Sequence, residues 1–414
     1  MSAEIPEEKR RILDGKKLRT IRKSRKDEYG QLLIQTKLAQ KLNNMGVQIS
    51  QQAISDYERG EREQIHIDDL KKLAQVLELS SYKDLMPNRP PALGSNRAVL
   101  TQPQELRIGS ISTTFVVVDG DGEAEYQKEN LRCHYSRQPL KVPSDIKSLR
   151  VEIERKQVKA KKEGREHHWN GPMYGLERFV RSRTIYEEDL ELDIYFRPTD
   201  YFLFLATSMS LERQVEDGRG GRVTLRDKYL YGGERDRVVP FLATSFGIML
   251  AIITSDRYLI VTQRSGDVGS WTGCFSASAN EGLSRVLDRD ESGRPDPYRA
   301  GARGAREELS TEIEPADIRF LSFGFDSERY QWGLLGMTKA DLSLSEIQDR
   351  VSLGARDRWE NREIRFVPFD PPSVAAFVME NSPWQPGGLT CIIHTLIHEF
   401  GRDQVERALS LVKR

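Results

Sequence analysis

The chain has 414 residues, and 63 Lys and Arg stand against 63 Asp and Glu, so its formal net charge is zero. At roughly 150 residues per domain, this length predicts two to three domains. A hydrophobic fraction of 38% with 31 glycines is an ordinary globular composition and excludes disordered, collagen-like and disulfide-scaffold classes. Because Cys133, Cys274 and Cys391 lie far apart, we expect reduced thiols in a cytoplasmic protein.

The charge and hydropathy pattern gives no sign of membrane targeting. The N-terminus mixes acidic and basic residues and lacks the apolar stretch of a signal peptide. The uncharged run 238–254 contains Pro240 and Gly247 and falls short of the about 20 strongly apolar residues of a membrane span. We therefore expect a buried strand pair in this run and no membrane partner.

Element patterns along the chain predict a multidomain α+β protein. Residues 1–88 are helical and polar with no convincing strand, and a Pro-rich linker follows at 89–105. Residues 106–235 read as a β-rich middle domain whose role no motif indicates. Residues 236–414 mix strands and helices, as an α/β/α sandwich with C-terminal helices would.

The first block contains a helix, a turn and a second helix. Leu38, Ala39 and Leu42 share one face of the first helix, and residues 43–46 favour a turn. Ser50 suits the N-cap of a second helix that buries Ala53, Ile54 and Tyr57. This is the layout of a helix-turn-helix.

The second helix projects amide, hydroxyl and carboxylate side chains outward: Gln51, Gln52, Ser55 and Asp56. A glutamine amide can donate to N7 of adenine while accepting from the adjacent amino group, or it can bridge to a phosphate. Between Lys9 and Lys26 there are ten basic residues and one acidic residue. Such a run alone is typical of a solvated face, but before a helix-turn-helix it favours attraction to phosphates.

This segment resembles the Cro/phage-repressor (Xre-type) helix-turn-helix family over about residues 15–85. The matching residues are Gln35, Leu38, Ala39, SQQAIS (50–55), YERG (57–60) and DLKKLAQVLEL (69–79). The resemblance implies a five-helix domain that binds double-stranded DNA, usually as a homodimer. It also implies that Gln51, Gln52 and Asp56 face bases, that Gln35 and Ser50 face a phosphate, and that Arg22 pairs with Glu58 as scaffold. The connection at 26–33 and the turn at 43–48 are longer than the family pattern.

The middle and C-terminal blocks alternate short strands with helices. Strand-like runs occupy 111–118, 190–196, 201–206, 247–253, 258–262 and 319–325. A solvated helix is expected within 141–165, and further helices are expected at 298–313, 389–400 and 404–412. His394 and His398 share a helix face, but Thr395 stands where a zinc-binding HExxH motif has Glu, so we expect a structural pair.

The helix containing AGARGAREELS (300–310) carries two adjacent carboxylates, Glu307 and Glu308. Two such groups would share a hard divalent ion such as Mg²⁺ through oxygen ligands, although adjacent glutamates on a helix are typical of solvated surface. Upstream lie two strands and the loop GSWTGCFSASANEGLS (269–284).

This order resembles the Nudix hydrolase family over roughly 240–370. Arg303 matches the signature Arg, Glu307 and Glu308 match its metal-binding pair, and Glu281 looks like the loop acid, displaced by an insertion at 285–299. Gly304 stands where the signature has its first helix Glu, and Ser310 replaces the signature Gly. Loss of one carboxylate removes charge that Mg²⁺ needs. Glu281 or Glu360 would have to replace it.

Two functions of different class follow from these patterns. The first is a DNA-binding transcription regulator, a homodimer whose Nudix-like domain senses a nucleotide-derived small molecule. The alternative is a Mg²⁺-dependent hydrolase of nucleoside diphosphates linked to another group, in which Arg303 and Glu281 serve catalysis and the helix-turn-helix only localises the enzyme. A scaffold that binds no DNA is a third class.

Overall fold

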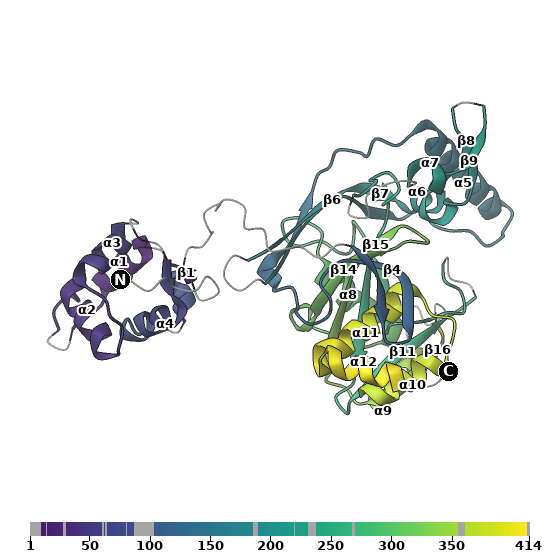
Figure 1. Cartoon of the computed structure of the whole chain (residues 1–414). Coiled ribbons are helices and arrows are strands. Elements are labelled where there is room, and N and C mark those ends of the chain that lie inside the picture. Colours follow the sequence, from purple (N-terminus) through teal and green to yellow (C-terminus); the bar gives the residue numbers. More distant parts are fainter. Residues whose placement is uncertain are drawn as a thin grey trace. The chain divides into compact units, whose positions relative to one another are not determined.

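The computed structural model describes residues 10–13, 15–27, 30–59, 62, 64–79, 81–86, 103–184, 189–218, 220–230, 237–266, 270–354 and 361–411. These residues form two compact units that divide near residue 97 (Figure 1). A helical unit is followed by a mixed α/β body rich in strands, which confirms the predicted multidomain α+β class.

The first unit is built from short helices and one small strand pair. Its elements are α1 (Gly15–Ser24), α2 (Gln35–Asn44), α3 (Gln51–Arg59), α4 (Ile67–Val76), a 3-10 turn (Tyr82–Leu85), β1 (Arg10–Ile12) and β2 (Gln64–His66). Leu38, Leu42 and Ile54 are fully buried, as the helical spacing predicts, whereas Ala53 is only half-buried. The antiparallel pair β1–β2 was not expected from the sequence.

The turn between α2 and α3 is held by one side chain. The Asn43 amide donates to the carbonyls of Ala39 and Ile49, and its oxygen accepts from the Ile49 amide. Gly46 has a φ of +79°, a conformation that glycine adopts without strain. These contacts fix the direction in which α3 leaves the turn.

The second unit is organised around a mixed nine-stranded sheet. Its strands are β3 (Gln104–Ile108), β4 (Ile111–Asp119), β10 (Phe246–Ile253), β11 (Tyr258–Arg264), β12 (Phe275–Ser276), β13 (Ala279–Gly282), β14 (Arg319–Asp326), β15 (Gln331–Lys339) and β16 (Asn361–Pro368). The order is β12-β11-β10-β15-β14-β4-β3, with β13 pairing β10 and β16 pairing β11. The central pair β10–β15 is parallel.

Helices cover both faces of this sheet. They are α8 (Pro297–Leu309), α9 (Leu344–Gly354), α10 (Pro371–Glu380), α11 (Pro386–Phe400) and α12 (Arg402–Leu411). Ala305 and Leu309 of α8 belong to the core on one face, and Ile392 and Leu396 of α11 belong to the core on the other. Figure 1 shows α11 and α12 together at one side of the strands. This is the expected α/β/α arrangement.

A smaller sheet, β5-β7-β6, shares the α8-side core. Its strands and the elements around it are β5 (Leu131–Tyr135), β6 (Pro172–Arg183), β7 (Leu190–Asp200), α5 (Ser144–Lys162), α6 (Tyr201–Ala206), α7 (Leu225–Tyr229), β8 (Gln214–Glu216), β9 (Arg222–Thr224) and 3-10 turns at Lys128–Asn130, Ser208–Ser210 and Pro315–Asp317. The helix expected within 141–165 is α5.

The structure departs from the expected domain boundary at residue 235. Strands β3 and β4, assigned to the middle domain, extend the large sheet because β4 pairs with β14. Residues on both sides of 235 also share one continuous apolar core. Local patterns do not show this, because the pairing joins segments about 200 residues apart in the chain.

Three local predictions were wrong. The run 201–206 is helix α6, not a strand, because the Asp200 side chain caps it by accepting from the Leu203 amide. The run 238–254 holds one strand, β10, and not a pair. The helix expected to reach residue 313 ends at Leu309, where Ser310 adopts left-handed backbone angles.

None of the helices in the described ranges combines the length and apolar character that a bilayer crossing requires.

Candidate functional site

The first candidate site is the outer face of α2 and α3. Ser50, Gln51 and Gln52 are exposed, while Gln35, Ser55 and Asp56 are partly exposed. Hydrogen bonds join these residues: Gln51 Nε2 donates to Gln35 Oε1 at 3.1 Å, and Gln52 Nε2 donates to Asp56 Oδ1 at 2.8 Å. The Ser50 hydroxyl accepts from the Ala53 amide at 3.1 Å, as an N-cap does. The structure thus places the six sequence-predicted residues at the start of α2, at the cap of α3 and along α3.

A buried ion pair supports this face from behind. Arg22 donates to both oxygens of Glu58, at 2.5 Å and 2.9 Å, as the sequence predicted, and also to the Leu33 carbonyl. Gln35 Nε2 donates to Glu58 Oε2 at 2.8 Å. Burial would raise the pKa of Glu58, but the hydrogen bonds from Arg22 and Gln35 outweigh it and lower that pKa. A charged Glu58 therefore orients Gln35, and Gln35 orients Gln51.

Arg59 is a residue of this face that the sequence reading missed. It donates to the Ser55 hydroxyl at 2.9 Å and to Asp56 at 2.6 Å. The guanidinium offsets the Asp56 charge, which would otherwise repel a polyanion. Arg59 follows Asp56 by three residues and Ser55 by four, and residues at these spacings are neighbours on a helix, so the sequence could have indicated these contacts.

The basic segment before α2 is only partly available to a ligand. Arg22 is buried against Glu58, Lys17 donates to the Met86 carbonyl and Arg25 donates to the Glu78 carbonyl. Arg19 and Lys23 are exposed on α1. The net charge counted from the sequence therefore overstates the charge presented to solvent.

The second candidate site surrounds Arg303 of α8. The guanidinium donates to Glu281 Oε2 at 2.7 Å, to Glu307 Oε2 at 2.9 Å and to both oxygens of Asp288 at 2.9 Å. It also donates to the Gly282 carbonyl at 3.1 Å. Burial lowers the pKa of Arg303, but the hydrogen bonds to Asp288 and the nearby negative charges outweigh it and raise that pKa. Arg303 therefore holds the three carboxylates in place, and its five hydrogen bonds leave the predicted catalytic role a prediction.

Asp288 is the member of this cluster that the sequence did not reveal. It is fully buried and also accepts from the Ser284 amide at 2.7 Å. Its surroundings in the chain, LDRDESG, read as a solvated loop, and its partner Arg303 lies 15 residues away. No local pattern could have paired them.

Glu281 fills the space left by Gly304. A Cβ atom at position 304 would lie 2.5 Å from Glu281 Cγ and 3.5 Å from Ala279 Cβ. The loop acid therefore replaces the missing helix glutamate in space. Glu360, the other suggested replacement, lies outside the described residues.

The carboxylates as arranged do not fit Mg²⁺. Glu281, Asp288 and Glu307 all bond to Arg303, and Glu308 Oε1 accepts from the Asn280 amide at 2.8 Å. Across the described residues, no three His, Cys, Asp or Glu side chains are grouped to hold a metal ion. The predicted metal pair, Glu307 and Glu308, is buried, and one member is ion-paired and the other bonded to backbone.

Two further titratable groups are buried beside the sheet. Asp326 accepts from Trp271 Nε1 at 3.0 Å, and burial raises the pKa of its carboxyl group to about 6. His394 hydrogen-bonds the Ser322 hydroxyl at 2.8 Å, and burial lowers its pKa to about 4. His394 thus packs as a core residue, as its spacing predicted.

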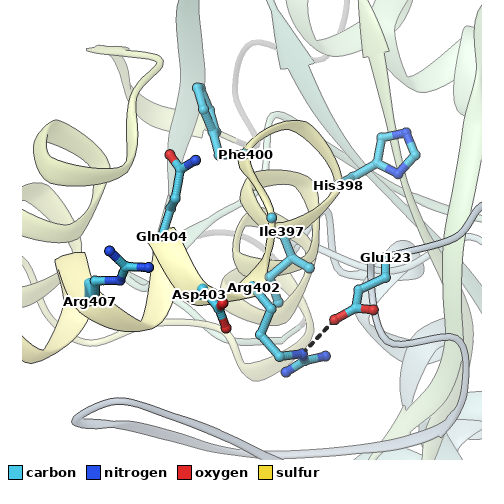
Figure 2. A pocket seen from close by; sticks show the side chains of 9 residues that line it. Glu123, Ile397, His398, Phe400, Arg402, Asp403, Gln404 and Arg407 are labelled. Atoms are coloured by element: carbon cyan, nitrogen blue, oxygen red, sulfur yellow. Dashed lines mark hydrogen bonds and ion pairs between the residues drawn. The ribbon is translucent and has the colours of Figure 1, made fainter.

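A pocket of about 580 Å³ lies at the junction of α11 and α12, on the side of the sheet opposite Arg303. Figure 2 shows Arg402 reaching Glu123 there, and the two side chains lie 3.0 Å apart. Arg402 also bonds to Asp121. Arg402 is therefore already paired with acids, while Arg407 is a second guanidinium group in the lining of this pocket.

Comparison with known proteins supports the first site. Residues 21–82 match the helix-turn-helix family model. The N-terminal unit is a helix-turn-helix domain. The match ends before the second unit begins, so it says nothing of the residues around Arg303.

Similarity to solved structures is low. DR0079 from Deinococcus radiodurans is 18% identical over 37% of this chain and 89% of that chain, with a TM-score of 0.26. A MutT/nudix family protein from Enterococcus faecalis is 12% identical over 30% of this chain and 43% of that chain, with a TM-score of 0.22. Likenesses this weak do not bear on function. No curated protein matches the chain.

Proposed function

We propose that this chain is a cytosolic DNA-binding transcription regulator that binds double-stranded DNA as a homodimer. One observation carries the proposal: the helix-turn-helix presents exposed glutamines at the start of α3, held from behind by the Arg22–Glu58–Gln35 network. Amides fixed before binding lose less conformational freedom when they meet base edges. Dimers of such domains contact two half-sites about one helical turn apart.

In this proposal α3 enters the major groove. Gln51 and Gln52 read bases, Ser55 and Asp56 flank them, and Gln35 with the capped end at Ser50 meets a phosphate. On contact with adenine, Gln52 exchanges its bond to Asp56 for one to the base, while Arg59 keeps the Asp56 charge offset.

The test is DNA selection followed by variant binding. Fragments bound by the full chain are enriched from a random duplex library, and affinity is measured for a selected site and for its scrambled sequence. We expect Gln52→Ala to weaken the selected site by about tenfold or more while the scrambled site is unchanged. Gln40→Ala, an exposed glutamine on α2, is the matched control.

Two outcomes would contradict DNA reading by α3. If Gln52→Ala weakens both fragments equally, Gln52 contacts no base. If the unmodified chain shifts no fragment even at low salt, the domain is a protein-interaction scaffold.

For the second unit we propose a sensing role instead of hydrolysis. The support is the arrangement of the carboxylates, which are engaged by Arg303 and by backbone and do not form a metal-binding set. A nucleotide-derived small molecule would then bind without being cleaved, and would change DNA affinity only if it binds the two states unequally.

Incubation of the full chain with a panel of nucleoside-diphosphate compounds and Mg²⁺ should give no turnover. Turnover that disappears in Glu308→Gln would overturn the sensing role and establish the hydrolase.

A further inference from the structure

A second pocket, of about 500 Å³, lies in the α/β unit between α5, α6, the β6–β7 hairpin and the turn after β13. Its volume is in the range of small-molecule sites, about 300–1,000 Å³. Leu140, Pro172, Pro198 and Leu203 give it apolar walls. Rigid apolar walls of this kind fit a flat or aliphatic body.

The polar lining of this pocket is mainly cationic. Lys147, Arg150 and Arg285 face one acid, Asp200. The Arg150 guanidinium donates hydrogen bonds to both carboxylate oxygens of Asp200, at 2.8–3.1 Å, and one to Glu154 at 3.1 Å. The charges of Arg150 and Asp200 therefore offset each other and leave Lys147 and Arg285 to define the potential.

Lys147 and Arg285 lack counter-charges within the described ranges. Neither has a carboxylate at ion-pair distance among the described residues. The Arg285 Nε atom is shielded from solvent and has no hydrogen-bond acceptor in that part of the chain. A buried donor left unpaired costs free energy that a bound acceptor would recover.

The position of Arg285 is fixed by backbone contacts on both sides. Its amide donates to the Pro172 carbonyl at 3.1 Å, and the preceding Ser284 amide donates to Asp288 at 2.7 Å. Asp288 in turn holds Arg303. The pocket and the carboxylate cluster therefore share one turn, but they differ in sign: the cluster is rich in acids, whereas the pocket has unpaired cations.

We propose that this pocket binds a small organic anion, with a carboxylate or phosphate head at Lys147 and Arg285 and an apolar body against Leu140, Pro172 and Leu203. An anion is disfavoured among Glu281, Glu307 and Glu308 and favoured here. Only the regulatory consequence of binding, a change in DNA affinity, rests on the proposed sensing role. Binding itself is measured without DNA, so failure of either proposal is seen separately.

The test uses the full chain and the fluorescent probe anilinonaphthalene sulfonate, an aromatic body with one anionic group. We expect one saturable site per chain. Arg285→Gln and Lys147→Gln should each raise the Kd about tenfold, because each removes a charged contact to the head group. Arg289→Gln, four residues away and outside the pocket lining, is the matched control and should leave the Kd unchanged.

The melting temperature of each variant shows whether it is folded. Arg285→Lys is a second control, because it keeps the positive charge and should retain binding of the probe. Lys147 is exposed on α5, so Lys147→Gln tests the site even if Arg285→Gln is unstable. Unchanged probe affinity in Lys147→Gln and in a folded Arg285→Gln would overturn the proposal, as would an equal loss in Arg289→Gln.

Competition with the probe then identifies the head group. Displacement by octanoate supports a carboxylate ligand, and displacement by adenosine monophosphate supports a phosphate ligand. Two results would overturn recognition of an organic anion. One is that octanol displaces the probe as effectively as octanoate does, and the other is that none of these compounds displaces the probe.

Discussion

At the residue scale, Arg303 pairs with a buried group of three acids. Asp288 is fully buried, and Glu281 and Glu307 are nearly so. Removing one partner from a buried ion pair leaves an uncompensated charge, which costs more than the pair contributes. Arg303 should therefore be needed for folding irrespective of any reaction.

We expect Arg303→Met to lower the free energy of unfolding by about 3–5 kcal/mol. All five tryptophans lie in the second unit, so fluorescence-detected urea unfolding reports this unit alone. Arg294→Met, which removes an exposed pair with Asp290, should cost less than about 1 kcal/mol. Equal losses in the two variants would show that the Arg303 cluster does not stabilise the fold.

Asp326 and His394 oppose each other in their response to pH. Because the folded-state pKa of Asp326 is raised to about 6, its contribution to stability is present at low pH and is lost as pH rises toward 6. The pKa of His394 is lowered to about 4, so its contribution is present at neutral pH and is lost as pH falls from about 6.5 to 4. The two effects partly cancel in the native chain.

Asp326→Asn removes one of these opposed effects. We expect this variant to lose about 2–3 kcal/mol more stability than the native chain on going from pH 7 to pH 4. Unfolding followed by circular dichroism at each pH measures the difference. Asp317→Asn changes an exposed carboxylate and should follow the native profile. A variant at Asp326 that also follows it would contradict the raised pKa.

At the element scale, the end of α8 is a position suited to glycine. Ser310 has φ 52° and ψ 31° and ends the helix in the left-handed region. Side chains other than glycine are strained there by roughly 1 kcal/mol.

We expect Ser310→Gly to stabilise the second unit by about 0.5–1 kcal/mol and to raise its melting temperature. Ser148→Gly provides the opposite case, because this exposed serine lies in the interior of α5 and glycine there should cost about 0.5 kcal/mol. If both variants lower the melting temperature, the backbone at Ser310 is not strained.

Elements defined by local chemistry were predictable, and elements defined by distant partners were not. Helices α2 and α3 follow from the periodicity of Leu38 and Leu42 and from the cap at Ser50. The six-residue apolar run of α6 resembles a strand by composition, and only the capping Asp200 distinguishes it. The ion pairs of Asp288 depend on a turn that no periodicity marks.

At the scale of the whole molecule, the sheet joins the segment 104–119 to the segment after residue 236. Phe115 and Val116 are buried in the two cores, one on each face of the sheet. Without β3 and β4, strand β14 would become an unpaired edge, and edges of this kind promote association between chains.

We expect the fragment 98–414 to unfold cooperatively and the fragment 237–414 to lack a cooperative transition or to aggregate. Thermal unfolding by circular dichroism and sizing by gel filtration measure both properties. The fragment 1–97, which holds the helices of the first unit and their apolar core, should fold alone. A soluble 237–414 fragment with the melting temperature of the longer one would contradict the joint sheet.

The contact between Gly304 and Glu281 constrains the order in which this chain can change. Because a side chain at 304 would collide with Glu281, and Arg303 holds the Glu281 carboxylate, a glutamate can enter at 304 only after residue 281 has been shortened. The intermediate sequence has neither acid and leaves Arg303 with one partner fewer. Introducing a glutamate at position 304 by single substitutions would therefore pass through a sequence that has lost one of the acids around Arg303, and we expect that sequence to be less stable than the present one.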